Sequence, residues 1–541
     1  MQRTLPLLAM MAGALCAAPA QATGSSLTSV SSSASLSWQT CSEIPGGIPA
    51  GIASRVQCAT LSVPLDWHDA AAHPYIDVQV MRVRAGRPEG RKGAIFVNQG
   101  GPGVDNRQAF LGMVKSWQAR SVDDALEGTR RRMVDNFDLV MVVPRWIGGA
   151  LVRECSRIDE AAARRYFLED QSDEHWQALD DSVKRFAESC SAHPQAATTT
   201  TEQHVRDMEK ARILMGEPSL NFFGASYGTT VGALYASLFP HHVGRMVMDS
   251  AMNVSKPGHW QVIEAQGHRY RDLWRFATAP AAKDPARWNL GSDSRAIYAG
   301  LKAMPMILRA MWAQSLNLPE DVAAALKLAS WYAAEPAGRR TRAVMLQHVS
   351  DYRFDANIHR DEPLRRSAER LAGKLPETAG DLSTVYYGAD AATFAVHCND
   401  SRWFARPDAI RAHFERTIRP DVVVSDGHDS LLALVCAHWT PNEGANRPSM
   451  EKLRLAPEFL VIQNRRDWFT PLGGVEDFLS AVPNARLVVV DDNRHVVMAG
   501  PANCATAAAG TFLTTGTLPA APRNTCEEGQ LTPHVPGRDE L

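Results

Sequence analysis

LNFFGASYG, residues 220–228, is the stretch of sequence that decides the fold of this chain. Residues 220–223 have the short apolar pattern of a strand that is buried on both faces. Gly224, Ser226 and Gly228 then form the pattern G-x-S-x-G, and residues 229–238 continue as a helical pattern. Between a strand and a helix, this pattern is typical of a sharp turn that exposes a serine hydroxyl. We therefore predict that Ser226 is a nucleophile.

Other strand-like runs lie on both sides of this turn. Short apolar segments alternate with helical patterns, which predicts an α/β fold with a mostly parallel central sheet flanked by helices. Residues 76–80 alternate in period two and predict an antiparallel edge strand. The apolar segments are residues 94–97, 139–143, 246–248, 459–462 and 487–490.

The alternation stops between residues 256 and 454, where the sequence is rich in helical patterns. The last two strand-like runs follow this stretch. One α/β core, residues 36–255 and 455–541, with a large helical cap inserted at 256–454 explains this order better than two tandem domains. Such a cap is expected over the carboxyl edge of the sheet, where ligands of these sheets bind.

Two residues after the late strands complete a catalytic triad with Ser226. In folds with this serine turn, the acid and then the histidine follow the nucleophile along the chain. Asp467 follows the strand at 459–462, and His495 follows the strand at 487–490. We predict that His495 is the general base and that Asp467 orients it. Asp491 and Asp492 are the alternative acids.

A glycine-rich loop, NQGGPG at residues 98–103, follows the first buried strand. Adjacent glycines let the main chain approach a substrate carbonyl oxygen closely. In this kind of fold, one oxyanion donor comes from that loop and the other from the residue after the nucleophile. We assign these donors to the backbone N–H groups of Gly101 and Tyr227.

The beginning of the chain predicts export. Arg3, an apolar run at residues 5–18 and Ala20-Gln21-Ala22 have the pattern of a signal peptide, residues 1–22, that is cleaved after Ala22. The run is shorter than the about 20 residues of a membrane span. Residues 23–35, rich in serine and threonine, predict a flexible leader. The destination is the periplasm or the medium.

Charge and cysteine content limit the partners. The 541 residues carry a formal net charge of −2, which gives no field that would attract nucleic acid. Removal of the signal peptide leaves eight cysteines, an even number that suggests disulfides in an oxidising compartment. The predicted disulfide pairs are Cys41–Cys58, Cys155–Cys190, Cys398–Cys436 and Cys504–Cys526.

No thiolate or histidine motif typical of a metal site occurs, so we expect neither metal nor cofactor.

Together these segments resemble the secreted tripeptidyl-aminopeptidase-like (TAP-like) branch of the prolyl aminopeptidase superfamily. The resemblance implies the α/β-hydrolase fold and hydrolysis through an acyl-enzyme that releases residues from the free N-terminus of a peptide. It also implies an acidic residue that holds the substrate ammonium; Asp400, beside Cys398, is one candidate, with a solvated or helix-capping role as the alternative. The segments are residues 58–66, 98–103, 224–240, 245–250, 467–471, 495 and 504–526.

The chain departs from the family pattern near the expected pocket. Where the family has D-x-R-G-x-G-x-S, residues 143–150 read VPRWIGGA. Trp146 therefore places a large ring where a glycine is usual, and we predict that it contacts the substrate. Two alternatives to an aminopeptidase remain: an esterase or amidase that uses the same triad on a small non-peptide acyl compound, and a binding protein without turnover.

Overall fold

The computed structural model describes residues 35–41, 44–71, 74–147, 155, 157–381, 391–401, 409–412, 423, 427–440, 447–527 and 529–533. The predicted signal peptide and all but the last residue of the predicted leader lie outside these ranges. None of the helices in the described ranges combines the length and the apolar run that crossing a bilayer requires.

One sheet of ten strands organises the described residues, in the order β1-β2-β4-β3-β5-β6-β7-β8-β9-β10. Strands β4, β3, β5, β6, β7, β8 and β9 run parallel, whereas β1, β2 and β10 pair antiparallel with their neighbours. The strands are β1 (Val56–Pro64), β2 (Tyr75–Val83), β3 (Ala94–Asn98), β4 (Asp138–Val142), β5 (Leu220–Ala225), β6 (Val243–Asp249), β7 (Phe459–Asn464), β8 (Ala485–Val490), β9 (Arg523–Glu527) and β10 (Gln530–Pro533).

The predicted antiparallel strand at residues 76–80 is part of β2, but β2 is not the edge. The edge strand is β1, whose residues alternate between buried and exposed over much of its length. The sequence analysis missed β1 as a strand, and so placed the edge one strand too far inside the sheet.

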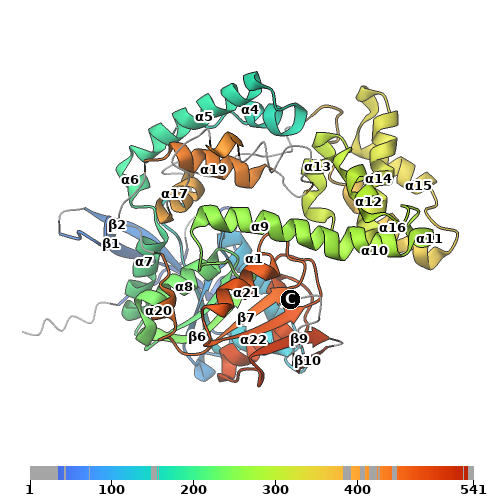
Figure 1. The fold of residues 1–541 in the computed structure, drawn as a ribbon. Coiled ribbons are helices and arrows are strands. Elements are labelled where there is room, and N and C mark those ends of the chain that lie inside the picture. Colours follow the sequence, from blue (N-terminus) through green and yellow to red (C-terminus); the bar gives the residue numbers. More distant parts are fainter. Residues whose placement is uncertain are drawn as a thin grey trace, which may run out of the picture. The chain divides into compact units, whose positions relative to one another are not determined.

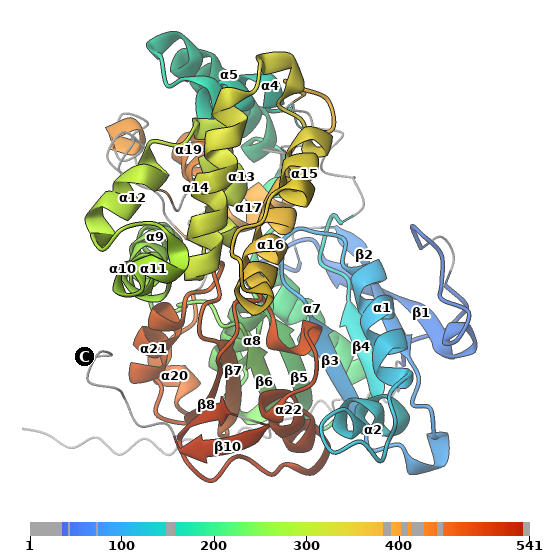
Figure 2. The same ribbon diagram turned by 90° about the vertical axis from the view of Figure 1, so that its right-hand side faces the viewer.

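Helices cover both faces of the sheet, and alternate strand residues point to opposite faces. Phe96 of β3 joins one buried cluster with α7, α8 and α21, while its neighbours Ile95 and Val97 join the other with α1, α2 and α22. Figure 2 shows α1, α2 and α22 beside the strands. These helices are α1 (Arg107–Gln118), α2 (Gly128–Asn136), α7 (Thr201–Leu214), α8 (Gly228–Leu238), α20 (Met450–Leu453), α21 (Leu472–Ser480) and α22 (Cys504–Thr515).

The cap has two hydrophobic clusters. One consists almost entirely of residues 273–375, which form α10 (Ala279–Lys283), α11 (Pro285–Trp288), α12 (Ser294–Lys302), α13 (Met306–Trp312), α14 (Pro319–Ala334), α15 (Arg342–Asp351) and α16 (Ile358–Ala372). The other combines α4 (Glu160–Arg164), α5 (Asp173–Ser191) and α6 (Pro194–Ala197) with α17 (Ala391–Asp400) and α19 (His428–His438). The long helix α9 (Gly258–Asp272) leads from the core into the cap (Figure 1).

The second cluster changes the predicted domain boundary. Residues 155–197 were expected in the core because they precede the serine turn. In the structure, the apolar face of α5, including Leu179, Val183 and Phe186, belongs to the same buried cluster as Leu431 and Leu434 of α19. The cap therefore draws on two separate segments, one before the turn and one after it.

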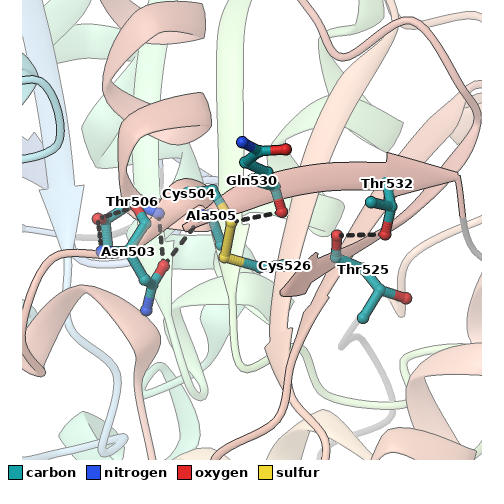
Figure 3. The surroundings of a disulfide bond; sticks show 8 residues. All are labelled: Asn503, Cys504, Ala505, Thr506, Thr525, Cys526, Gln530 and Thr532. Carbon is teal, nitrogen blue, oxygen red and sulfur yellow. Dashed lines mark hydrogen bonds between the residues drawn. A yellow bond between two sulfur atoms is a disulfide. The ribbon is translucent and has the colours of Figure 1, made fainter. Parts of the chain in front are cut away.

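Disulfides connect the same four pairs of cysteines that the sequence order suggested. Cys41 is bonded to Cys58, Cys155 to Cys190, Cys398 to Cys436 and Cys504 to Cys526. The third joins two cap helices, α17 and α19. The fourth joins the start of α22 to β9, and Figure 3 shows it beside Asn503, whose side chain accepts hydrogen bonds from the N–H groups of Ala505 and Thr506 at 3.0 Å.

Candidate active site

Ser226 lies in a sharp turn between β5 and α8. Its φ is 55°, in the left-handed region that a residue with a side chain rarely adopts. The turn requires close crossing of the backbone: a Cβ at Gly228 would lie 2.0 Å from the carbonyl oxygen of Asn98, and one at Gly224 would lie 2.5 Å from that of Gly228. The sequence GASYG therefore folds into the strained conformation that presents a serine side chain.

His495 and Asp467 lie in the loops beyond β8 and β7. The Nδ1 atom of His495 lies 2.9 and 3.0 Å from the two carboxylate oxygens of Asp467. This contact makes Nδ1 the protonated nitrogen, so Nε2 is the one available as a base. Although burial lowers the pKa of His495, the hydrogen bond and charge of Asp467 outweigh it, and the pKa is raised above 6.5.

The carboxylate of Asp467 is itself held in place. It is buried, and it accepts hydrogen bonds from the N–H of Phe469 at 2.9 Å and the N–H of Thr470 at 3.1 Å. The Oγ1 atom of Thr470 donates a third at 3.0 Å. Thr470 was not predicted to have a role; the two backbone N–H groups, two and three residues after Asp467, are the ones that an aspartate side chain typically bonds.

The alternative acids have other partners. Asp491 forms ion pairs with Arg465 and Arg466 and is mostly exposed. Asp492 pairs with Arg494 and accepts a hydrogen bond from the N–H of Asn493 at 2.7 Å. Among the described residues, the carboxylate that contacts the ring of His495 is that of Asp467.

The glycine-rich loop lies directly against the serine turn. A Cβ at Gly100 would meet the backbone nitrogen of Tyr227 at 2.7 Å, so the loop reaches this position only with glycine. The loop is fixed by Asn98, whose Oδ1 accepts from the N–H of Gly100 at 2.9 Å, and by Asn106, whose Nδ2 donates to the carbonyl of Gly100 at 2.7 Å. Within the described ranges, neither the N–H of Gly101 nor that of Tyr227 donates a hydrogen bond.

A cavity of about 260 Å³ opens at Ser226. Core and cap both contribute to its wall; the core supplies Gly101, Ser226, Tyr227 and Phe469, and the cap supplies His397, Asp400, His428 and Asp429. Its volume lies just below the about 300–1,000 Å³ that ligand sites span. The sequence analysis did not identify His397, His428 or Asp429, because the cap sequence carries no motif that marks them.

Asp400 is partly buried in the wall of this cavity, at the end of α17. Its Oδ1 accepts from the N–H of Thr201 at 2.9 Å, and its Oδ2 accepts from the phenol of Tyr227 at 2.7 Å. Burial raises the pKa of Asp400 to about 6. No arginine or lysine in the described part of the chain forms an ion pair with it. Among the described residues, Asp400 is therefore a partly buried carboxylate that lines the cavity of the serine and forms no ion pair with an arginine or lysine.

Two further side chains affect the cavity: His397 its charge, and Arg269 the position of its wall. Burial, with a smaller effect of His428, lowers the pKa of His397 to about 4, so this ring is neutral at pH 7. Arg269 of α9 pairs with Asp429 at 2.6 Å and donates to the carbonyl of Trp468 at 2.7 Å. This arginine thus ties the cap to the loop that carries Asp467.

Trp146 does not belong to the residues that line the cavity. Its partly buried ring packs against the cap cluster around α4 and α5, because an apolar ring gains more from that cluster than from an open cavity. The adjacent Arg145, buried between β1 and α7, bonds both carboxylate oxygens of Asp207 at 2.7 and 2.8 Å. The predicted contact of Trp146 with the substrate therefore has no support in the described residues.

No group of three or more histidine, cysteine, aspartate or glutamate side chains in the described ranges is arranged to hold a metal ion.

The chain is similar to several known proteins. Residues 423–526 match the family model described as TAP-like protein. The tripeptidyl aminopeptidase of Streptomyces coelicolor is 26% identical over 497 residues, which cover 89% of this chain and 84% of the relative. The serine protease Hip1 of Mycobacterium tuberculosis is 27% identical over 258 residues, 46% of this chain and 44% of the relative. A solved structure of a probable hydrolytic enzyme from Pseudomonas aeruginosa PAO1 matches 86% of this chain and 94% of its own, with 11% identity and a TM-score of 0.30.

Proposed function

This chain is a TAP-like serine hydrolase of the α/β-hydrolase fold, and we propose from that premise that it is an exported aminopeptidase. It releases residues or short peptides from the free N-terminus of a peptide through an acyl-enzyme. The observation that carries the proposal is the partly buried carboxylate of Asp400 in the wall of the cavity that contains Ser226.

In this proposal the reaction follows the serine-hydrolase scheme. Ser226 Oγ attacks the scissile carbonyl while His495 Nε2 takes its proton, and Asp467 stabilises the imidazolium that forms. The N–H groups of Gly101 and Tyr227 stabilise the oxyanion, a contribution of about 10²–10³ in turnover for each donor. His495 then gives its proton to the leaving amine, and water hydrolyses the acyl-enzyme by the same steps in reverse.

Asp400 gives the site its preference for a free N-terminus. A buried carboxylate without a cationic partner is costly, and a substrate ammonium supplies the missing charge. Each of its oxygens accepts one hydrogen bond from Thr201 or Tyr227, and a carboxylate oxygen has a further lone pair to offer. Because pairing with a cation favours the ionised form, substrate binding is expected to lower the pKa of Asp400 again.

The proposed compartment is the periplasm or the medium. Four disulfides, each between cysteines 17 to 38 residues apart, support an oxidising environment, since such bonds rarely persist in the cytosol.

A substrate panel tests the proposal. Aminoacyl- and tripeptidyl-arylamides with a free N-terminus are compared with their N-acetylated analogues by kcat/KM. We expect at least tenfold lower values for the acetylated compounds, and we expect Asp400→Asn to remove most of that difference. Equal cleavage of free and blocked peptides by the wild type would eliminate the role of Asp400 in recognising the ammonium.

A second candidate function is an esterase or amidase that acts on a small non-peptide acyl compound. This function is favoured by Lys256 and Arg447, which line the same cavity. Their positive charges would repel a substrate ammonium. Short acyl esters in the same panel distinguish the two functions. A fluorophosphonate probe tests both, since labelling of the wild type and its loss in Ser226→Ala are expected for either.

A further inference from the structure

Asp249 connects the serine turn with the histidine loop, yet the mechanism above gives it no role. It is the last residue of β6 and is fully buried. Its carbonyl oxygen accepts a hydrogen bond from the N–H of Ser226 at 2.9 Å. Its carboxylate accepts from the N–H groups of Val497 and Met498, both at 2.8 Å, and each oxygen takes one of them.

The next residue continues the same contact. Ser250 Oγ accepts from the N–H of Val496 at 3.0 Å. Both Ser250 and Val496 have a positive φ, 56° and 68°, which costs free energy in residues with side chains. The three consecutive N–H groups that follow His495 therefore all bond to side chains at the end of β6.

The carbonyl groups of the histidine loop are held from the other side. Arg130 of α2, which is only 2% exposed, donates to the carbonyls of Met498 and Gly500 at 3.0 Å each. Asn464 Nδ2, at the end of β7, donates to the carbonyl of Arg494 at 2.8 Å. The backbone on both sides of His495 is thus fixed by buried polar groups from three different elements.

We propose that Asp249 is a positioning residue, which aligns His495 with Ser226 by hydrogen-bonding both the serine turn and the loop that follows the histidine. The inference rests on the proposed serine mechanism. An ionised carboxylate suits this task because it offers two acceptors and no donor. Asparagine has nearly the same shape, but its NH₂ group would face the N–H of Val497 or Met498.

The charge of Asp249 also acts on the base. The charged groups that face it are His495, Asp467 and Arg130. Burial raises the pKa of Asp249 to about 7, and its negative charge contributes to the raised pKa of His495. Above pH 7 the carboxylate of Asp249 is ionised and both of its oxygens accept hydrogen bonds. Below pH 7 it is protonated, and one oxygen then carries a proton that faces an N–H group.

Asp249→Asn in the full chain tests the proposal. We expect kcat on the best arylamide to fall about ten- to hundredfold, the range in which small misplacement of catalytic groups acts, with KM within about twofold. We also expect the acid limb of kcat/KM to move to lower pH, because the base loses a neighbouring negative charge. A purely structural role would lower the melting temperature without moving that limb.

Asp138→Asn is the matched control. Asp138 is also a buried carboxylate of the sheet, but it starts β4 at the opposite end, where it pairs with Arg91 at 3.0 Å. This variant is expected to lose stability and to keep both kcat and the acid limb. If folded Asp249→Asn behaves in the same way, the proposal is overturned.

Ser250→Ala keeps the test decisive if Asp249→Asn does not fold. It removes the hydrogen bond from Val496 and the longer one, 3.4 Å, that Ser250 donates to Asp249, but it keeps the carboxylate, so a three- to tenfold lower kcat with a nearly unchanged acid limb is expected. Wild-type kcat in this variant would then contradict the positioning role. A wild type that neither turns over the panel nor reacts with fluorophosphonate would instead refute the proposed function, and the role of Asp249 with it.

Discussion

The phenol of Tyr227 donates a hydrogen bond of 2.7 Å to Asp400, so that one residue of the serine turn contacts the cap with its side chain while its backbone N–H is the proposed oxyanion donor. The ring of Tyr227 also packs edge-on against His397 of the same cap helix, with centroids 5.1 Å apart. Core and cap therefore meet at the residue next to the nucleophile.

Tyr227→Phe separates these two roles. The backbone N–H stays, whereas Asp400 loses one hydrogen-bond donor and its charged form becomes less stable. We expect a several-fold higher KM for peptides with a free N-terminus and an almost unchanged kcat. Steady-state kinetics on free and blocked arylamides measure this. Tyr235→Phe, which removes a buried hydrogen bond of 2.6 Å to Glu209 away from the cavity, is the control and should leave KM unchanged.

Asp467→Asn is expected to lower kcat by about 10⁴-fold, because the amide no longer fixes the tautomer of His495. The variant should fold, since asparagine retains the size of the side chain; circular dichroism checks this. Asp491→Asn and Asp492→Asn serve as controls. Their carboxylates pair with arginines, so both are expected to stay within a few-fold of the wild type. A large loss of kcat in either would reassign the acid.

The activity is expected to rise with pH. His495 accepts the serine proton only in its neutral form, and its pKa lies above 6.5 because Asp467 stabilises the charged form. The acid limb of kcat/KM should therefore have its midpoint above pH 6.5. A pH–rate profile on one arylamide provides the measurement, and a midpoint near pH 5 would mean that another group controls the limb.

The disulfide between Cys398 and Cys436 is expected to matter for substrate binding as well as for stability. It joins α17 and α19, which carry His397, Asp400, His428 and Asp429 to the cavity. Replacing both cysteines by serine should cost about 2–4 kcal/mol of stability and raise KM several-fold.

The pair Cys504–Cys526 offers the matched control for that experiment. It closes a shorter loop, with a sequence separation of 22 against 38, a difference that changes the stabilisation little because it depends on the logarithm of loop length, and it joins α22 to β9 away from the cavity. Its double serine variant should lose comparable stability and keep KM. Equal changes in KM for the two double variants would show that the cap disulfide has no specific effect on the cavity.

Much of the core and of the candidate site could be predicted from the sequence because both rest on local patterns. The GASYG turn, the buried strands around it and the loops that end in Asp467 and His495 each have a signal that a short window contains. Thr470 and Asp249 were assigned no role because their importance depends on which backbone groups they meet after folding.

The expectations from the sequence and the structure differ mainly in long-range packing. Trp146 was expected at the substrate because of its place in a family motif, but its ring joins the cap cluster instead. Residues 155–197 were assigned to the core because they precede Ser226. Their partners, α17 and α19, lie about two hundred residues later, a distance at which no local pattern reports contact.

Because the cap is built from two separate segments, the substrate specificity of this chain cannot be exchanged with that of a relative by swapping one segment alone. A chimera that replaces only residues 256–454 would remove α17 and α19, which belong to the same buried cluster as Trp176, Leu179 and Val183 of α5, and put a relative's helices in their place. Transplanting substrate preference between relatives therefore requires moving both segments together, across a junction on each side of the strand that ends in the nucleophile.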